Sequence, residues 1–188
     1  MKPGSKFRRR RGRSTVQLVR PDEFADLLSS VQRSAFHLEV QDSYLVDDED
    51  EHFAKFLAGE VDDYAWMDGW SDLVRSVVAR GCKVERARVV TVPHSDYIRW
   101  SLEVSRVNIA AGEDIRYLPR HEISPDLLTA EDWWLFDSER VGFTAVDAAG
   151  RWVGTAVTDD HKVVDMCVAV RDSVWPIAIP HADYLSHR

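Results

Sequence analysis

The order of helix-like and strand-like patterns is the feature of this sequence that most constrains the fold. In the first two thirds, stretches with apolar residues at helical spacing alternate with short strand-like runs, as in sheets whose strands are connected by helices. Three strand-like runs, DWWLFD, RVGFTAVDA and RWVGTAVTD, then follow one another, with the turn sequence DAAGR between the last two. The sequence therefore predicts one α/β or α+β domain, in which helices flank a mixed β-sheet and a late antiparallel meander precedes a C-terminal helix.

Five helices are predicted from apolar stripes and from residues that favour helix ends. The end signals are, in chain order, Pro21 and Asp22 for the first start, Gly59 and Gly81 for the next two ends, Ser95 and Gly112 for the fourth helix, and Asp160 and Pro176 for the fifth. On the second helix, Phe53, Phe56 and Leu57 are expected to be buried.

Three strands are predicted before the meander, and the third of them follows the fourth helix. The first, AFHLEVQ, places Phe36, Leu38 and Val40 on one face and His37, Glu39 and Gln41 on the other. Strict alternation of this kind is typical of a strand with one buried face and one face in water. The others are KVERARVVTV, which ends at Pro93, and EDIRYLPR. In the meander, the adjacent Trp133 and Trp134 must face opposite ways.

Charge is distributed unevenly along the chain. Seven of the 24 Lys and Arg residues, and none of the 32 Asp and Glu residues, lie within the first thirteen positions, so the remainder carries a formal charge of about −15. A chain of 188 residues with 45% hydrophobic residues is long enough for one buried core. We expect a basic leader without fixed structure at 1–15, one globular domain at 16–180 and a short tail at 181–188.

Several classes of protein and of site are excluded. Cys82 and Cys167 are not spaced as thiolate metal ligands, and two cysteines are too few for a disulfide framework. No apolar signal-peptide core follows the leader, and no apolar run approaches the roughly 20 residues of a membrane span. The seven histidines are scattered, and Walker, dinucleotide-binding and H-E-x-x-H motifs are absent. The sequence thus predicts a cytoplasmic protein with no membrane association, no cofactor and no metal.

Arginines, carboxylates and aromatic residues concentrate in SDYIRWSLEVSRVNIAAGEDIRYLPR, which runs from Ser95 to Arg120. One hypothesis is that arginines of this stretch line a groove near Tyr97 that accepts a phosphate, a carboxylate or a partner's acidic patch. The alternative is that its helical arginines form only surface ion pairs with Glu103. The candidate binding residues are Asp96, Tyr97, Arg99, Asn108, Glu113, Arg116 and Arg120.

The motifs SDYIRW, NIAAGEDIRYLPR and DWWLFD followed by GRWVGTAVTDD resemble an uncharacterised actinobacterial domain family whose members are commonly encoded beside XRE-type helix-turn-helix regulators. The resemblance extends from about Phe24 to Trp175 and includes FAKFLAGE and RARVVTVPHSDY. The resemblance implies a cytoplasmic accessory protein that acts with such a regulator. It implies no particular biochemical activity. The arginine-rich leader departs from the family's usual pattern.

A weaker resemblance is to the phospholipase D-like fold. The chemistry of that fold requires a histidine nucleophile and a lysine two residues later, which holds the phosphate oxygens. Here Ile123 stands two residues after His121, and Val163 stands two residues after His161. If the fold is related, its catalysis is therefore expected to be lost.

Two functions from different classes follow. The first is a regulatory or interaction protein that acts with a helix-turn-helix DNA-binding protein and takes a small anionic ligand as its signal. The alternative is a hydrolase or nuclease that acts on phosphate esters through an atypical site around Asp96, Tyr97, Arg99, Glu113 and Arg116. The leader is either a solubilising extension or a nonspecific nucleic-acid arm made of Arg8, Arg9, Arg10, Arg11 and Arg13.

Overall fold

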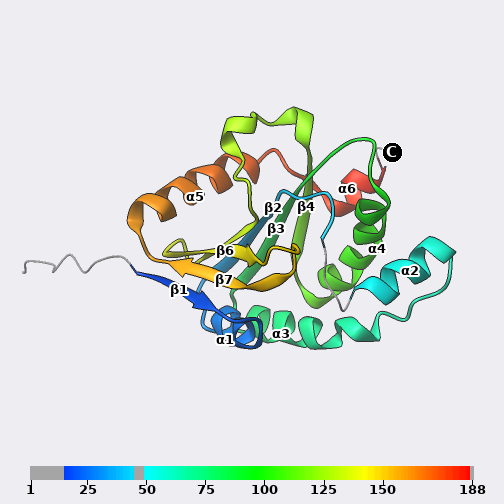
Figure 1. Ribbon diagram of the computed structural model, residues 1–188, viewed down its shortest axis with the longest axis horizontal. Helices are drawn as coiled ribbons and strands as arrows, with labels where there is room; N and C mark the ends of the chain where they lie inside the picture. The colour runs from blue at the N-terminus through cyan, green and yellow to red at the C-terminus, as the bar shows by residue number, and fades with distance from the viewer. Residues whose placement is uncertain (1–14, 45–48, 187–188) are drawn as a thin grey trace, which may run out of the picture.

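The computed structural model describes residues 15–44 and 49–186. Its strands are β1 (Val16–Val19), β2 (Ser34–Glu39), β3 (Lys83–Val90), β4 (Asp114–Pro119), β5 (Trp133–Phe136), β6 (Arg140–Val146), β7 (Trp152–Thr158) and β8 (Ile179–Pro180). They form one eight-stranded sheet in the order β1-β7-β6-β5-β2-β3-β4-β8, with helices on both faces (Figure 1). The predicted single α+β domain with a mixed sheet is confirmed.

All five predicted helices are present. The helices are α1 (Phe24–Ser29), α2 (Asp50–Ala58), α3 (Asp68–Ala79), α4 (Asp96–Ala111), α5 (His161–Val174) and α6 (His181–Ser186), with single 3-10 turns at Pro21–Glu23, Ala65–Met67, Arg120–Glu122 and Pro125–Leu127. Ser95 caps α4 as predicted, because its hydroxyl accepts a hydrogen bond from the backbone N–H of Ile98 at 3.2 Å. Gly59 and Gly112 end α2 and α4 in the left-handed conformation, with φ of 71° and 109°.

The centre of the sheet is parallel and its flanks are antiparallel. Strands β2, β3 and β4 run parallel to one another, which the helices between them make possible. Strands β5, β6 and β7 form the predicted antiparallel meander, and β5 pairs with β2. The meander therefore extends the sheet on one side of β2, so that β2 and β3 lie in its middle.

Helices cover the two faces of the sheet unequally. Helix α5 covers one face, which we call the α5 face, and α1, α3 and α4 cover the other, which we call the α3 face (Figure 1). On the α5 face, the fully buried Leu38, Ala87 and Trp133 pack with Cys167 and Val174 of the helix. This face holds the largest apolar cluster of the domain.

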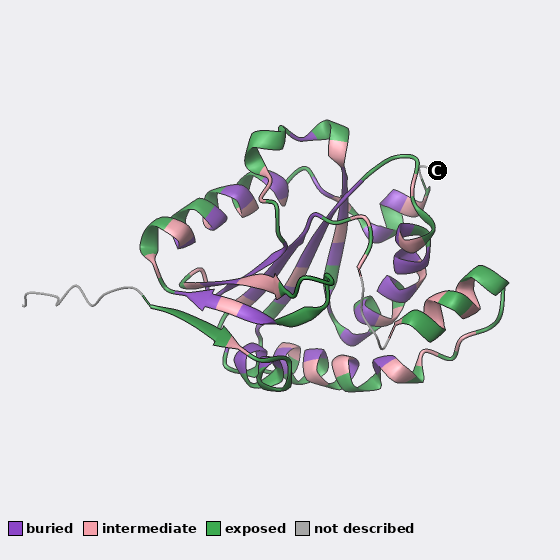
Figure 2. Ribbon diagram, viewed as in Figure 1, coloured by how far each residue is buried: buried purple, intermediate pink, exposed green. Residues whose placement is uncertain are grey.

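Strand β2 differs from the prediction, because it is buried on both faces (Figure 2). His37 and Glu39, which were expected to face water, are only 9% and 6% exposed. The reason is topological: β2 lies between β3 and β5, where helices cover both sides of the sheet. The two faces of β2 were predicted correctly, but the face that carries His37 and Glu39 points into the molecule instead of into water.

Two further segments pack differently from the prediction. The segment expected to be a C-terminal tail contains α6, whose His181 and Tyr184 are buried. His181 lies with its Nε2 2.9 Å from the carbonyl oxygen of Leu102 on α4, so the last helix is part of the fold. On α2, Phe53 is half-buried as part of an aromatic cluster, but Leu57 is 56% exposed because α2 lies at the periphery.

The arginine-rich leader, including Arg8 to Arg13, lies outside the described residues, so its predicted contact with nucleic acid stays a prediction. No helix within residues 15–44 and 49–186 has the length and apolar character that a membrane crossing requires. The first described strand, β1, pairs with β7 at one edge of the sheet.

Candidate functional site

Four polar side chains lie at alternate positions of the two central strands. They are His37 and Glu39 of β2 and Arg86 and Arg88 of β3, and all four are buried. The parallel register pairs His37 with Arg86 and Glu39 with Arg88. Because successive side chains of a strand point to opposite faces, all four project to the α3 face, away from the apolar core. We call them the polar quartet.

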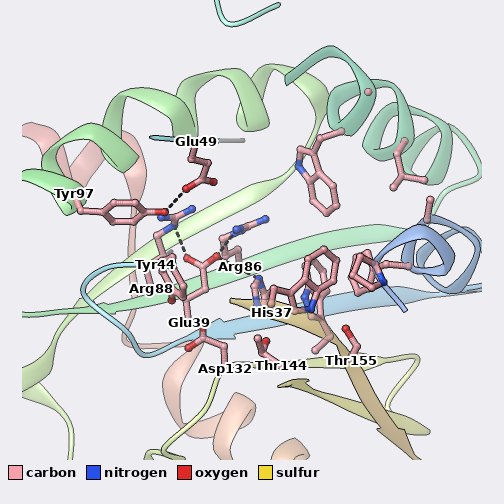
Figure 3. A pocket seen from close by; sticks show the side chains of 18 residues that line it. His37, Glu39, Tyr44, Glu49, Arg86, Arg88, Tyr97, Asp132, Thr144 and Thr155 are labelled. Atoms are coloured by element: carbon pink, nitrogen blue, oxygen red, sulfur yellow. Dashed lines mark hydrogen bonds and ion pairs between the residues drawn. The ribbon is translucent and has the colours of Figure 1, made fainter. Parts of the chain in front are cut away.

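The polar quartet borders a cavity of about 470 Å³ between the sheet and the helices of the α3 face (Figure 3). Small-molecule sites commonly have volumes of about 300–1,000 Å³. The floor and walls include, besides the quartet, Trp134, Thr144, Trp152 and Thr155 from the sheet, Phe24, Trp70, Leu73 and Tyr97 from helices, and Tyr44, Glu49 and Asp132 from connections. The cavity therefore has the size and the mixture of aromatic and charged groups that ligand sites have.

Arg86 is held on two sides by carboxylates. Its Nε donates a hydrogen bond to Glu113 Oε1 at 2.6 Å, and its Nη1 donates to Glu39 Oε1. The guanidinium also lies 5.9 Å and 5.8 Å from the ring centroids of Trp70 and Trp134. Burial alone would lower the pKa of Arg86, but the charges of Glu113 and Glu39 raise it. Arg86 is therefore a fixed, paired charge that ties β3 to the end of β2 and to Glu113 just after α4.

Arg88 is held much less completely. Its Nε lies 2.8 Å from Glu39 Oε2, but neither atom has a partner at hydrogen-bond geometry among the residues that the structure describes. Figure 3 shows the Arg88 guanidinium between Glu39 and a second pair, in which the Tyr97 hydroxyl donates to Glu49 Oε2 at 2.6 Å. Arg88 is thus a buried cation at the cavity wall that, within the described residues, is ion-paired with Glu39 alone, without hydrogen-bond geometry at its Nε.

Other buried atoms around the cavity also lack hydrogen bonds. Both ring nitrogens of His37 and the Nε1 of Trp70 lack a hydrogen-bond partner within the described part of the chain. Buried polar groups are nearly always paired, because leaving one unpaired costs about 1–3 kcal/mol. Their concentration around one cavity is what a site for a polar ligand requires.

Burial and charge set the protonation states of these groups. Burial lowers the pKa of His37 to about 3, so the imidazole is neutral at pH 7. Burial works against ionisation of Glu39, yet the charges of Arg86 and Arg88 bring its pKa down to about 2. Burial raises the pKa of Asp132 to about 6, and the negative charge of Glu39 adds to this effect. Glu39 is therefore ionised at neutral pH, whereas Asp132 gains a proton on mild acidification.

One end of the cavity is aromatic. The Phe24 ring meets Trp134 and Trp152 edge to face, with centroids 5.5 Å and 5.8 Å apart. The His37 imidazole stacks on Trp134 at 4.1 Å and 12°. Trp152 belongs to β7, which β6, β5 and β2 separate from the Arg88 strand. The cavity thus has an aromatic end at Trp152 and a charged end at Arg88.

Two of the predicted binding residues belong to this site. Tyr97 lines the cavity, and Glu113 accepts the hydrogen bond from Arg86. Asn108 is buried on α4, and its backbone carbonyl accepts the N–H of Glu113 at 3.1 Å. The helix end at Gly112, which the sequence predicted, therefore places Glu113 within reach of Arg86.

The predicted groove lined by several arginines is not formed. Arg99 projects from the exposed side of α4 and forms an ion pair with Asp96, three residues earlier on the same helix. Arg106 forms a similar pair with Glu103 at 3.1 Å. For the exposed face of α4, the structure thus shows surface ion pairs as in the alternative hypothesis, although only Arg106 has Glu103 as its partner. Such pairs contribute little to stability.

Arg116 and Arg120 lie apart from α4's arginines and from each other. Arg116 lies on β4 next to Tyr117, so its side chain takes the opposite face, where it lies 3.9 Å from the centroid of the Trp175 ring. Arg120 donates to the backbone carbonyls of Val40 and Val89 near the ends of β2 and β3. Any contact of these arginines with a ligand or partner stays a prediction.

Sequence reasoning missed His37, Glu39, Arg86 and Arg88 as site residues. A signal was present, because H-x-E and R-x-R place polar side chains two residues apart in two predicted strands, which the structure puts side by side near the sheet centre. Charged residues are rarely buried unless they are paired, so two such strands side by side indicate a buried polar site. The pairing of the two strands was the missing information.

The chemistry that this arrangement supports is recognition of an anion by hydrogen-bond donors. Guanidinium, indole N–H and neutral imidazole groups surround the cavity. Across residues 15–44 and 49–186, no three His, Cys, Asp or Glu residues are grouped so that they could hold a metal ion.

Comparison with known proteins identifies one family and one fold. Residues 22–186 match the family described as "Domain of unknown function (DUF6879)". No curated protein matches the chain significantly. Among solved structures, NucT from Helicobacter pylori, a phospholipase D-like nuclease, is similar with a TM-score of 0.50 over 89% of this chain and 98% of that chain, at 10% sequence identity. At this identity the likeness concerns the fold alone, and it agrees with the weaker resemblance seen in the sequence.

Proposed function

The chain belongs to the DUF6879 family of unknown function, and we propose that it is a ligand-binding domain whose cavity takes a small organic anion. The observation that carries the proposal is Arg88, a buried guanidinium at the wall of a 470 Å³ cavity. Its Nε has no hydrogen-bond partner among the described residues.

The unpaired atoms favour an anion over a cation. Arg88 and the Trp70 indole are donors only, and the neutral imidazole of His37 offers one donor. Glu39, the ionised carboxylate nearest to them, already lies against two guanidinium groups. A phosphate or carboxylate would accept hydrogen bonds from these donors, and bonds to charged groups contribute about 1.5–3 kcal/mol each.

A matched pair of variants tests the proposal. We expect calorimetric titration at low ionic strength to detect binding of phenyl phosphate, and Arg88→Met to weaken it at least about tenfold, as the loss of one charged hydrogen bond requires. Arg99→Met removes an equal charge from the exposed face of α4 and is expected to leave the affinity unchanged. Equal affinities of the wild-type protein and Arg88→Met would overturn the proposal.

We propose that ligand binding serves a regulatory role beside a helix-turn-helix DNA-binding protein, in the cytoplasm. The support is the charge distribution, since about −15 on the chain beyond the leader would repel DNA and complement a basic partner. A pull-down with an adjacent XRE-type regulator at low salt should recover a complex that dissociates as salt is raised. Recovery of nothing at low salt would contradict this role.

Hydrolysis of phosphate esters is the second candidate function, and His37 is the observation that favours it. The imidazole is neutral, has no hydrogen-bond partner among the described residues and lies beside Arg86. A nucleophilic histidine would need these properties. Release of p-nitrophenolate from bis(p-nitrophenyl) phosphate, lost in His37→Gln, would establish this function, whereas binding without turnover supports the first.

A further inference from the structure

We infer that the anion bound by this cavity is a nucleoside monophosphate or a molecule of similar build, in which a planar base is separated from the phosphate. The phosphate lies at Arg88 and the base lies at Trp152. This inference rests on the proposed function. It depends on how Trp152 reaches the cavity, on how the ring is held there and on the distance between the two ends.

Trp152 lines the cavity because β7 is irregular. Thr155 also lines the cavity, and in a regular strand a residue three positions earlier would face the opposite side of the sheet. The register between β6 and β7 shifts, so that Gly154 pairs with Ala145 and Trp152 pairs with Val146. Val153 is the extra residue of this bulge. Bulges commonly re-aim a side chain, and here the bulge turns Trp152 to the face of Thr155.

The Trp152 ring is also fixed in place. Its Nε1 donates to the carbonyl of Gly154 at 2.7 Å, and its edge-to-face contact with Phe24 has an interplanar angle of 81°. Gly154 has φ of 148°, and a Cβ there would lie 2.5 Å from the carbonyl oxygen of Val19, so only glycine fits. Trp152 is still 39% exposed, which places a large, immobilised ring at the edge of the cavity rather than in the core.

The distance between the two ends requires an elongated ligand. Strands β3 and β7 are four steps apart in the sheet, which corresponds to roughly 19 Å at about 4.8 Å per step. Long side chains shorten this gap, but an inorganic anion cannot meet both Arg88 and Trp152. Thr144 of β6 and Thr155 of β7 also line the cavity (Figure 3), and their hydroxyl groups suit a hydroxylated sugar between base and phosphate.

Three related probes separate the parts of this ligand. Calorimetric titration with AMP, ribose 5-phosphate and adenosine compares the whole ligand with the anion alone and the ring alone. We expect AMP to bind about tenfold more tightly than ribose 5-phosphate, because stacking of a base on an aromatic side chain contributes on that order. Adenosine should bind more weakly than AMP, and Arg88→Met should remove the difference between them.

Trp152→Leu supplies the decisive comparison. It keeps an apolar side chain, and we expect it to reduce AMP affinity to that of ribose 5-phosphate while the latter is unchanged. Trp66→Leu is the matched control, because Trp66 is also partly exposed but stacks on His52 outside the cavity. Near-ultraviolet circular dichroism confirms that each variant is folded.

The outcomes distinguish the two proposals. If ribose 5-phosphate binds through Arg88 and AMP binds no better, or if Trp152→Leu leaves AMP affinity intact, the inference about the ring is overturned and the proposed anion site stands. If phenyl phosphate, ribose 5-phosphate and AMP all fail to bind to the wild-type protein, both are overturned.

Discussion

The α5 face and the α3 face of the sheet are made from alternate residues of the same strands, and their contents are opposite. On β2 and β3, the α5 face presents Leu38 and Ala87, both fully buried in an apolar cluster. One residue away, the α3 face presents the polar quartet, also buried but surrounding a cavity. The α5 face is built as a protein core, whereas the α3 face holds buried ion pairs and polar atoms without hydrogen bonds to the described residues.

This contrast shows where the domain departs from the most stable arrangement. Replacing a buried ion pair by well-packed apolar residues is often neutral or stabilising, so burial of Glu39, Arg86 and Arg88 is not explained by stability. Local rules of good packing are usually broken at functional sites. The α5 face therefore maintains the fold, and the α3 face carries the groups that a ligand would use.

The largest effect is expected when the paired charge of the α3 face is removed. Arg86→Ala leaves Glu113 buried without its partner and removes one of two cations beside Glu39. We expect the free energy of unfolding to fall by about 3–5 kcal/mol, which is typical of a broken buried ion pair. Urea denaturation followed by circular dichroism measures this, and a loss below about 1 kcal/mol would mean that water reaches these carboxylates.

On the α5 face, Leu38→Ala is expected to lower the free energy of unfolding by about 3 kcal/mol, because Leu38 is fully buried and its removal leaves a cavity. Affinity for phenyl phosphate should be unchanged at temperatures where the variant is folded. A loss of affinity in the folded variant would show that the two faces are not independent.

The pH dependence of stability tests the carboxyl at the charged end. The pKa of Asp132 is raised from 3.8 to about 6, so the folded state holds a proton there more tightly than the unfolded chain does. The resulting stabilisation is present below about pH 4 and is lost as the pH rises to about 6. Asp132→Asn should therefore be more stable than wild type by roughly 1–3 kcal/mol at pH 7.5 and similar to it at pH 4.

The asparagine oxygen can still accept the hydrogen bond that Asp132 Oδ1 receives from the backbone N–H of Val40 at 2.7 Å. Paired urea titrations at the two pH values give the difference directly. A stability difference independent of pH would contradict a raised pKa for Asp132.

The smallest effect on stability is expected for Arg88, the cation that, among the residues the structure describes, is ion-paired with Glu39 alone. Arg88→Met removes a guanidinium whose contact with Glu39 lacks hydrogen-bond geometry, while Glu39 keeps its bond from Arg86. We expect the free energy of unfolding to change by less than about 1 kcal/mol. A loss as large as that of Arg86→Ala would mean that Arg88 is structural, and the contrast drawn between the two arginines would be wrong.

Features set by neighbouring residues were predictable from the sequence. The cap at Ser95, the left-handed end at Gly112 and the opposite directions of Trp133 and Trp134 depend only on local geometry, and all three are confirmed. The fold class followed from the order of such elements.

The site was not predictable to the same extent, because it depends on which strands become neighbours. His37 was assigned to the correct face of β2. Whether that face is exposed to water or covered by helices depends on the position of β2 in the sheet, which the sequence did not predict. Arg99 and Arg116 are close in sequence, yet the first lies on the outer side of α4 and the second on the α5 face. The bulge that brings Trp152 into the cavity leaves no sign in the periodicity of β7.

The alternation of core and cavity residues along β2 and β3 also limits how members of the family can diverge in length. Inserting or deleting one residue within Ser34–Glu39 would carry the carboxylate of Glu39 under α5 and bring Leu38 into the cavity, since a one-residue slip exchanges the faces of a strand. Connections at the periphery, such as the turn after Gly59, face no such restriction. Insertions and deletions should accordingly accumulate in those connections, while the spacing from His37 to Glu39 and from Arg86 to Arg88 is inherited unchanged.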